Sequence, residues 1–269
     1  MKRWLSTLLV FACCSAIVRA DVTFVQTAAI EGGMAAMAGS SGNRTTTTRL
    51  KGLKLRTEAD GGGVAIADVA AKQVVILRPD EKTATIKSIS ETTTSTASTT
   101  TATPASVEAT VATTGKSQVI DGARCDEYKL TSSMALSDVI GGRMPPEAAG
   151  MMQGLTVAVT GSIWAAKEGP GAADFVAFRK AAVSADMIAL MTGASGASFP
   201  GLDKLMTAVA NAEGLPYLVE ILISVEGTGP VADLLKPMGG MKITIKTTSV
   251  KADPLGDDLF KIPEGYTVK

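Results

Sequence analysis

Histidine is missing from this sequence of 269 residues, and its absence narrows the chemistry more than any other feature. Without imidazole the chain has no Ser-His-Asp or Cys-His couple, no side chain whose ordinary pKa lies near neutrality, and no ordinary zinc site. Carboxylate pairs or a serine with a lysine would remain as catalytic groups, but no spacing in the sequence indicates one. We therefore expect no catalytic residues, no metal ligands and no cofactor, and we expect that the protein is not an enzyme.

Cysteine is the other reactive residue type, and the chain has three: Cys13, Cys14 and Cys125. The first two lie in a segment with the features of a secretory signal, so Cys125 would remain alone, without a partner for a disulfide. A small buried hydrophobic side chain is the favoured interpretation of Cys125 over a redox role. In a regular strand Cys125 and Tyr128 face opposite sides, so either a bulge shifts the register or one of them faces solvent.

The first twenty residues have the three parts of a secretory signal peptide. Lys2 and Arg3 form a basic start, Leu8 to Val18 form an apolar core, and Ala20 closes a small-residue exit. This pattern predicts cleavage before Asp21 and a periplasmic or extracellular mature protein. A retained membrane anchor is the weaker alternative, because the core is well short of the roughly 20 residues that span a bilayer.

Lipid modification at Cys13 is a further alternative, although Phe11 fits such a site poorly. Removal of the signal takes away three positive charges, so the 26 basic and 26 acidic residues become 23 and 26, a net charge of −3. A mildly acidic chain lacks the basic surface that neutralises a phosphate backbone, which argues against nucleic acid as a partner. No second apolar stretch is long enough to cross a membrane, so we expect no transmembrane segment in the mature chain.

The stretch from Lys116 to Thr131 predicts a β-hairpin, because two β-prone runs meet at Asp121-Gly122, which tolerates the positive φ values of a type I′ turn. Upstream runs separated by short polar turns predict an antiparallel meander rather than βαβ units. The expected strands are Asp21 to Glu31, Thr45 to Glu58, Gly63 to Val69, Lys72 to Pro79, Thr83 to Ile89 and Ser106 to Thr113. The glycine-rich residues 32–43 predict a loop.

Four motifs, in this order, carry a family resemblance: LKGLKLRTE, ADVAAKQVVILRPDEKTATI, VIDGARCDEYKL and FKIPEGYTVK. They resemble the bacterial secreted family known as domain of unknown function 4412, over Asp21 to Leu130 and the last thirty residues. That family is similar in pattern to the periplasmic lipoprotein-carrier fold, a curved antiparallel sheet wrapped around helices. The resemblance brings no catalytic residues. Ala84 departs from the family pattern, which usually has an aromatic residue there.

The segment from Ser90 to Pro104 is low-complexity threonine and serine. It has too little apolar surface to offset the entropy of ordering, which predicts a flexible surface loop and the first site of proteolysis. A long edge strand is the alternative, since threonine favours β geometry.

The second half of the chain mixes strand and helix patterns. Met134 to Gly154 is rich in methionine, glycine and proline and predicts short helical turns. Apolar side chains at helical spacing predict amphipathic helices at Asp174 to Met191 and Gly201 to Ala212. Further alternating runs predict strands at Gly154 to Gly169, Pro216 to Val225 and Met241 to Lys251. Residues 227–240 predict a turn, and the final sixteen residues return apolar side chains to the body of the protein.

These elements predict a single α+β domain over residues 21–269, with a curved, mainly antiparallel sheet bent as a half-barrel and helices packed on its concave face. Incomplete cover would leave an apolar pocket that binds or carries a hydrophobic or lipid ligand. The side chains expected to line it are Tyr217, Val219, Ile221, Ile223, Leu205, Met206 and Phe178. The competing function is an envelope interaction or structural protein that acts through a protein partner, and the same side chains would then form a dry core.

Overall fold

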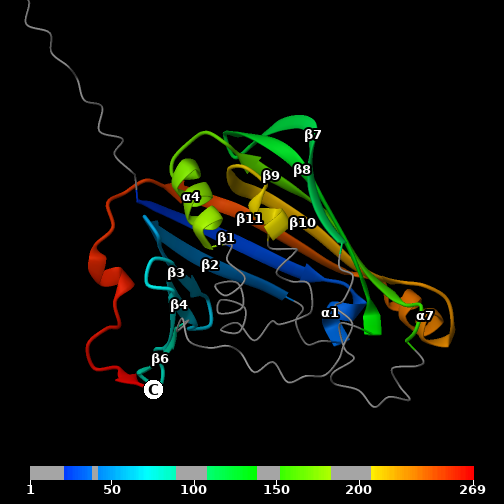
Figure 1. The fold of residues 1–269 in the computed structure, drawn as a ribbon, viewed down its shortest axis with the longest axis horizontal. Coiled ribbons are helices and arrows are strands. Elements are labelled where there is room, and N and C mark those ends of the chain that lie inside the picture. Colours follow the sequence, from blue (N-terminus) through cyan, green and yellow to red (C-terminus); the bar gives the residue numbers. More distant parts are fainter. Residues whose placement is uncertain (1–20, 38–41, 89–107, 138–151, 183–206) are drawn as a thin grey trace, which may run out of the picture.

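The computed structural model describes residues 21–37, 42–88, 108–137, 152–182 and 207–269 (Figure 1). The signal peptide expected at 1–20, which contains Cys13, the flexible loop expected at 90–104, and the pocket candidates Leu205 and Met206 lie outside the described residues. None of the helices in the described ranges is both long and apolar enough to cross a membrane.

Twelve strands form one open sheet in the order β12-β6-β5-β4-β3-β2-β1-β11-β10-β9-β8-β7. The bounds are β1 Val22–Glu31, β2 Gly42–Lys51, β3 Lys54–Ala59, β4 Val64–Asp68, β5 Gln73–Arg78, β6 Thr83–Ser88, β7 Glu108–Ile120, β8 Ala123–Ala135, β9 Thr156–Ala166, β10 Leu215–Glu226, β11 Met241–Lys251 and β12 Thr267–Val268. Every neighbouring pair is antiparallel except β12 with β6. The expected meander is therefore present twice, as β1 to β6 and as β7 to β11, and the two parts join where β1 pairs with β11.

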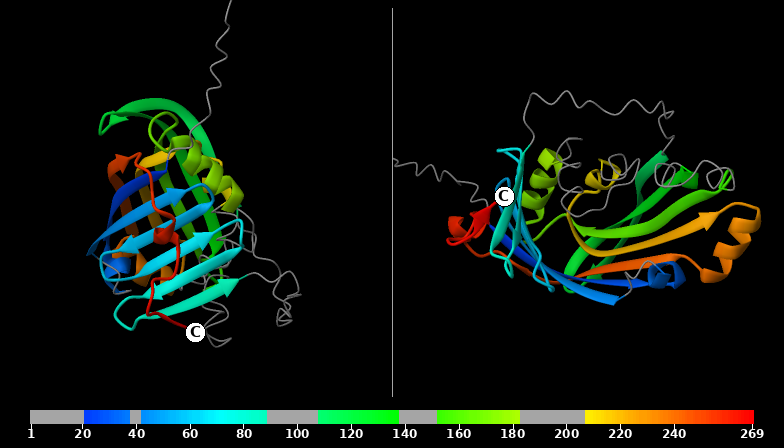
Figure 2. Two further views of the ribbon diagram at one scale, coloured as in Figure 1. Left: turned by 90° about the vertical axis from the view of Figure 1, so that its left-hand side faces the viewer. Right: turned by 90° about the horizontal axis from the view of Figure 1, so that it is seen from below.

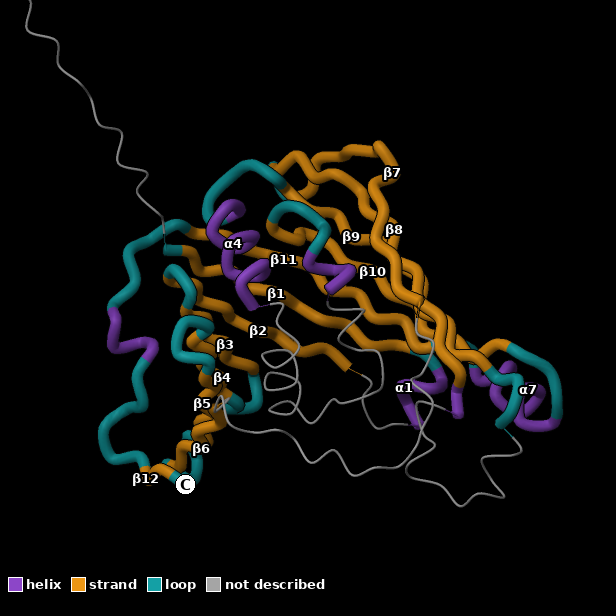
Figure 3. The backbone as a smooth tube through the Cα atoms, viewed as in Figure 1, coloured by secondary structure: helices purple, strands orange, loops and turns teal. Residues whose placement is uncertain are grey.

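Helices contribute little to the described residues, as the backbone tube in Figure 3 makes plain. Those described in full are α1 Gly33–Met37, α4 Ala172–Ala182 and α7 Pro230–Leu235, with 3₁₀ turns η2 Lys236–Met238 and η3 Asp257–Phe260. Residues 136–137 and 207–210 are also helical, the latter within the helix expected at Gly201 to Ala212. The structure thus confirms the mainly antiparallel sheet of the expected α+β fold, but the described residues are largely β. The structure has short helices at 33–37, within the loop expected at 32–43, and at 230–238, within the turn expected at 227–240. Helices of one or two turns are too short to show amphipathic periodicity in the sequence.

Helix α4 lies on the concave side of the bent sheet (Figure 2). Its Phe178 and Ala182 are buried in one cluster with Phe24 of β1, Leu50 of β2, Val74 of β5 and Leu215 of β10. Phe175 adds an edge-to-face contact with Phe24, with ring centroids 5.5 Å apart. Burial of each such side chain contributes about 1.5–3 kcal/mol, so this cluster fixes the helix on the sheet.

The C-terminal tail covers the other face of the sheet at β4, β5 and β6. Phe260 of η3 is buried with Ile66, Leu77 and Ala84, whose side chains point away from the α4 cluster. Arg56 Nη1 donates a hydrogen bond of 2.8 Å to the carbonyl of Leu259 and holds the tail in place. Both faces of β5 are therefore buried, which explains its continuous apolar sequence.

The β7–β8 hairpin turns at Asp121-Gly122 as predicted, with φ values of 46° and 82°. Strand β7 merges two segments expected to be separate, and its register against β8 shifts between Thr113 and Ser117. The shift bends the hairpin, and Asp121 at its tip reaches Lys246 of β11 at 3.4 Å. Cys125 and Tyr128 are both buried, so neither faces solvent; the register shift lies in the partner strand β7, and β8 pairs with β9 without a shift from Asp126 to Ala135.

Candidate functional site

Strand β10 places three of the sequence-predicted pocket residues, Val219, Ile221 and Ile223, on one face of the sheet. Each is partly buried, and each lies opposite an apolar residue of β11 in the order Ile245, Ile243 and Met241. On the other side, β9 pairs the same three residues with Ile163, Gly161 and Val159. We call the side chains of these residues on β9, β10 and β11 the apolar strip.

Tyr217 and Phe178 lie next to this strip but are placed differently. A register shift between Pro216 and Leu218 interrupts the alternation of β10 at Tyr217, which packs against the α4 cluster. Phe178 is 4% exposed inside that cluster, so it belongs to the core that holds α4 on the sheet. Sequence alternation could not reveal this, because a bulge changes the facing of residues without altering their pattern.

Gly161 is a residue of the strip that sequence reasoning missed. A Cβ added there would lie 2.2 Å from the carbonyl oxygen of Glu220 and 3.1 Å from Cα of Ile221. Only glycine therefore fits where β9 meets β10 so closely. The available signal was a glycine inside an otherwise regular strand pattern, which marks a bend or a close approach of two backbones.

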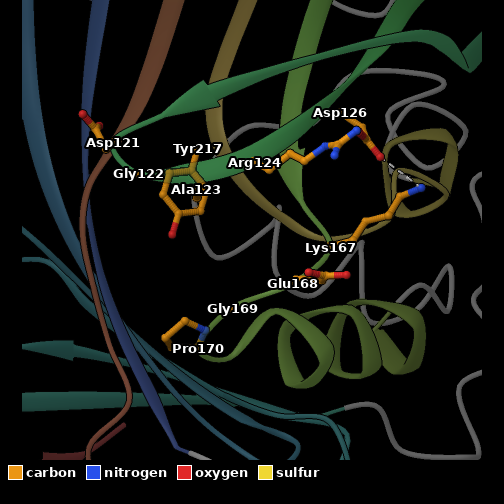
Figure 4. Close-up of a pocket in the computed structure, with 10 residues that line it drawn as sticks. All are labelled: Asp121, Gly122, Ala123, Arg124, Asp126, Lys167, Glu168, Gly169, Pro170 and Tyr217. Carbon is orange, nitrogen blue, oxygen red and sulfur yellow. Dashed lines mark ion pairs between the residues drawn. The ribbon is translucent and has the colours of Figure 1, made fainter.

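A polar groove with a volume of about 620 Å³ opens at the end of β10 where Tyr217 lies (Figure 4). The tip of the β7–β8 hairpin forms one wall, and the loop between β9 and α4 forms the other. The lining residues are Asp121, Gly122, Ala123, Arg124, Asp126, Lys167, Glu168, Gly169, Pro170 and Tyr217.

Lys167 organises the charges of this groove. Its ammonium group lies 3.3 Å from Asp126 and 3.4 Å from Glu213, and the hydrogen bond with Asp126 is the main cause that raises the pKa of Lys167. Hydrogen bonds from Ser117 and Lys167 in turn lower the pKa of Asp126. Lys167 and Asp126 are thus held further in their charged forms at neutral pH, which suits binding of polar groups and leaves neither of them poised for proton transfer.

Tyr217 and Cys125 complete the region as neutral groups. Burial is the main cause that raises the pKa of the Tyr217 hydroxyl, so it stays protonated and can donate a hydrogen bond. Burial also raises the pKa of the Cys125 thiol to about 11, with the charge of Asp126 adding to the effect. The thiol lies 3.5 Å from the carbonyl of Ala123. This environment favours the structural interpretation of Cys125.

Across the described residues, no group of three or more cysteine, aspartate or glutamate side chains is placed to hold a metal ion. No protein-family model matches the chain, and no curated protein matches it. The fold is similar to the crystal structure of an uncharacterized conserved protein from Thermus thermophilus, with a TM-score of 0.38 and 8% sequence identity. That similarity covers 94% of this chain and 91% of the other.

Proposed function

We propose that this protein, after export, binds an apolar chain such as the acyl group of a lipid on the apolar strip, as a carrier or sensor. The observation that supports the proposal is the continuous row of cross-strand aliphatic pairs, Val219 with Ile245 and Ile221 with Ile243. These side chains are only partly buried, whereas the neighbouring α4 cluster is closed. Sheet faces that keep apolar area accessible in one continuous patch are common sites of ligand contact.

The bend of the sheet supports the same proposal. Figure 2 draws the strands wrapped around the side on which α4 lies, which is compatible with the half-barrel expected from the sequence. A half-barrel of this kind would enclose an elongated ligand along its strands. Export to the periplasm or beyond would give such a carrier its place of action.

The energetics suit a ligand with a long hydrocarbon chain. Each buried CH₂ group contributes about 0.8 kcal/mol, so about fifteen of them contribute roughly 12 kcal/mol. Association costs about 4 kcal/mol or more, which leaves about 8 kcal/mol and an affinity near micromolar. A shorter apolar molecule would bind far more weakly.

The test compares Ile221→Trp with Leu222→Trp in the full chain, using Nile red and hexadecanol as neutral apolar probes. Ile221 faces the strip, whereas Leu222, its neighbour, faces the opposite side and is 45% exposed. We expect Ile221→Trp to abolish probe binding while the melting temperature stays within a few degrees, and Leu222→Trp to change neither. If wild type binds neither probe and Ile221→Trp lowers stability by about 1–3 kcal/mol, the strip is a dry core.

A second function is supported by the edge strand β7. Its thirteen residues end the sheet, and within the described part of the chain no strand pairs with its outer side. Val119 on this strand is 71% exposed. An unpaired edge can accept an extended segment of another envelope protein as an added strand.

Photo-cross-linking separates this second function from the first. A photoreactive residue at position 119 should give a discrete adduct in cells, and the same residue at Leu234, which is 69% exposed on α7, should not. Equal labelling from both positions, or none from position 119, would remove the edge-strand proposal and leave lipid binding untouched.

A further inference from the structure

The side chain of Tyr128 carries a buried hydroxyl group next to the apolar strip. Tyr128 is 6% exposed and packs in one cluster with Ile163 and Val219, which are both residues of the strip. Its Oη atom has no hydrogen-bond partner among the described residues. Buried tyrosine hydroxyls normally find a partner, so this donor is one that the described residues leave without an acceptor.

Arg179 of α4 brings a positive charge to the same place. The guanidinium lies 5.4 Å from the centre of the Phe175 ring, and Nη2 donates to the carbonyl of Ala212, a member of the Tyr128 cluster. The Nε atom is buried and has no partner in the described ranges. Within those ranges, no carboxylate forms an ion pair with Arg179. Burial lowers the pKa of this guanidinium, and a smaller electrostatic effect of Tyr128 raises it. Arginine nevertheless remains charged in proteins.

The two acidic groups nearby form ion pairs with Lys167 rather than with Arg179. Its ammonium lies 6.0 Å from the centre of the Tyr128 ring, and both Asp126 and Glu213 pair with it. Tyr128 also contributes to the raised pKa of Lys167, and an ammonium can only donate to the hydroxyl oxygen, so the proton of that hydroxyl still has no acceptor among the described residues. The two carboxylates are 32% and 60% exposed, so solvent screens them. Arg179 is thus a partly buried cation that, among the described residues, contacts a carbonyl and an aromatic ring but no anion, which is unfavourable for its buried part.

We propose that Arg179 and Tyr128 form a binding site for a single oxyanion, the carboxylate or phosphate head group of a lipid whose chain lies on the apolar strip. The hydroxyl of Tyr128 and the Nε–H of Arg179 each donate one hydrogen bond to the head group, and such charge-assisted bonds are the strong ones. Val219 touches the Tyr128 cluster, so the chain would start there and continue past Ile221 and Ile223. The inference rests on the proposed function and adds the class of ligand: anionic rather than neutral lipids.

The test measures three ligands of equal chain length on the full chain by displacement of Nile red. Palmitate carries a carboxylate, hexadecyl phosphate carries a phosphate monoester, and hexadecanol carries no charge. Wild type should bind the two anions about tenfold more tightly than hexadecanol, because one charge-assisted hydrogen bond is sufficient for that difference. Inorganic phosphate alone, followed by calorimetry, tests whether the head group binds without a chain.

Two variants and one control test whether Arg179 and Tyr128 cause the preference for anionic ligands. Arg179→Met keeps the apolar stem and removes the charge, Tyr128→Phe removes only the hydroxyl, and Lys180→Met removes a charge from the same helix. Arg179→Met and Tyr128→Phe should each lower affinity for palmitate about tenfold and leave hexadecanol unchanged, while Lys180→Met changes neither. Tyr128→Phe should also keep or raise the melting temperature, since it deletes an unsatisfied buried hydroxyl; a purely structural role predicts a loss.

The possible outcomes separate the two proposals. Equal affinity of wild type for palmitate and hexadecanol, or an anion preference that survives both variants, overturns the anion site and leaves the apolar strip as a binding site. If wild type binds neither palmitate nor hexadecanol, the proposed function is wrong, and so is the proposal that the oxyanion is the head group of a lipid. Binding of inorganic phosphate that disappears in Arg179→Met would keep the anion site but assign it to a free oxyanion.

Discussion

At the scale of single residues, burial decides the chemistry of the cysteine. Cys125 is fully buried and its pKa is raised to about 11, so at pH 8 it holds a far smaller thiolate fraction than a free thiol does. In the chain that begins at Asp21, where it is the only cysteine, the native protein should react with a thiol reagent at least about 100-fold more slowly than the unfolded protein. Similar rates for the two states would contradict this.

The same shift makes a pH prediction with a definite sign. Because the folded-state pKa of Cys125 lies above the unfolded value of 9.0, its contribution to stability is complete below pH 9 and is lost as the pH rises through 11. Urea unfolding of wild type and Cys125→Ala between pH 8 and 11 should show a steeper loss of stability in wild type. Parallel curves would show that burial does not perturb the thiol.

Gly161 carries a second prediction at this scale. Since its missing Cβ would meet the backbone of β10, Gly161→Ala should lower the free energy of unfolding by about 1–3 kcal/mol. Gly63→Ala is the matched control, because nothing lies within 4 Å of the added Cβ there. Chemical denaturation of both variants measures the difference, and equal stability would mean that the two strands can separate at low cost.

At the scale of elements, the C-terminal tail behaves as part of the core. Phe260 is 8% exposed against β4, β5 and β6, and a Phe→Ala change at such a position usually costs about 3–5 kcal/mol. Phe260→Ala should therefore lower the melting temperature markedly, whereas Leu234→Ala, at a side chain that is 69% exposed, should leave it unchanged. A small effect at Phe260 would show that the tail detaches before the sheet unfolds.

At the scale of the whole molecule, the sheet depends on one long-range pairing. Strand β1 lies between β2 and β11, with Thr23 opposite Lys251, so the first and last long strands join the two meanders. Removal of residues 241–269 would turn β1 and β10 into new unpaired edges. We expect that truncated chain to aggregate and to lose its cooperative thermal transition.

A shorter truncation is the control for this prediction. Removal of residues 267–269 deletes only the two-residue strand β12, which pairs with β6. That chain should elute in size-exclusion chromatography as the full chain does, without aggregation, and should unfold cooperatively. If the longer truncation does the same, each meander is stable alone and the β1–β11 pairing is not needed for folding.

The sequence by itself determined the local features of this protein. Period-two alternation located β1, β10 and β11, and Asp121-Gly122 located the hairpin turn, because strand periodicity and positive φ are properties of neighbouring residues. The absence of histidine, also read from the sequence, excluded the catalytic couples that depend on imidazole.

Only the tertiary structure decided how these pieces meet. The tertiary structure set the register shift at Tyr217, the cover of β5 on both faces, and the hydrogen bond from Arg179 to Ala212 in the Tyr128 cluster. Their positions depend on packing, bulges and desolvation, which leave no periodic signal in any single segment. For this reason only the structure shows that Phe178 belongs to the α4 cluster in the core, and that the Nε atom of Arg179 is buried.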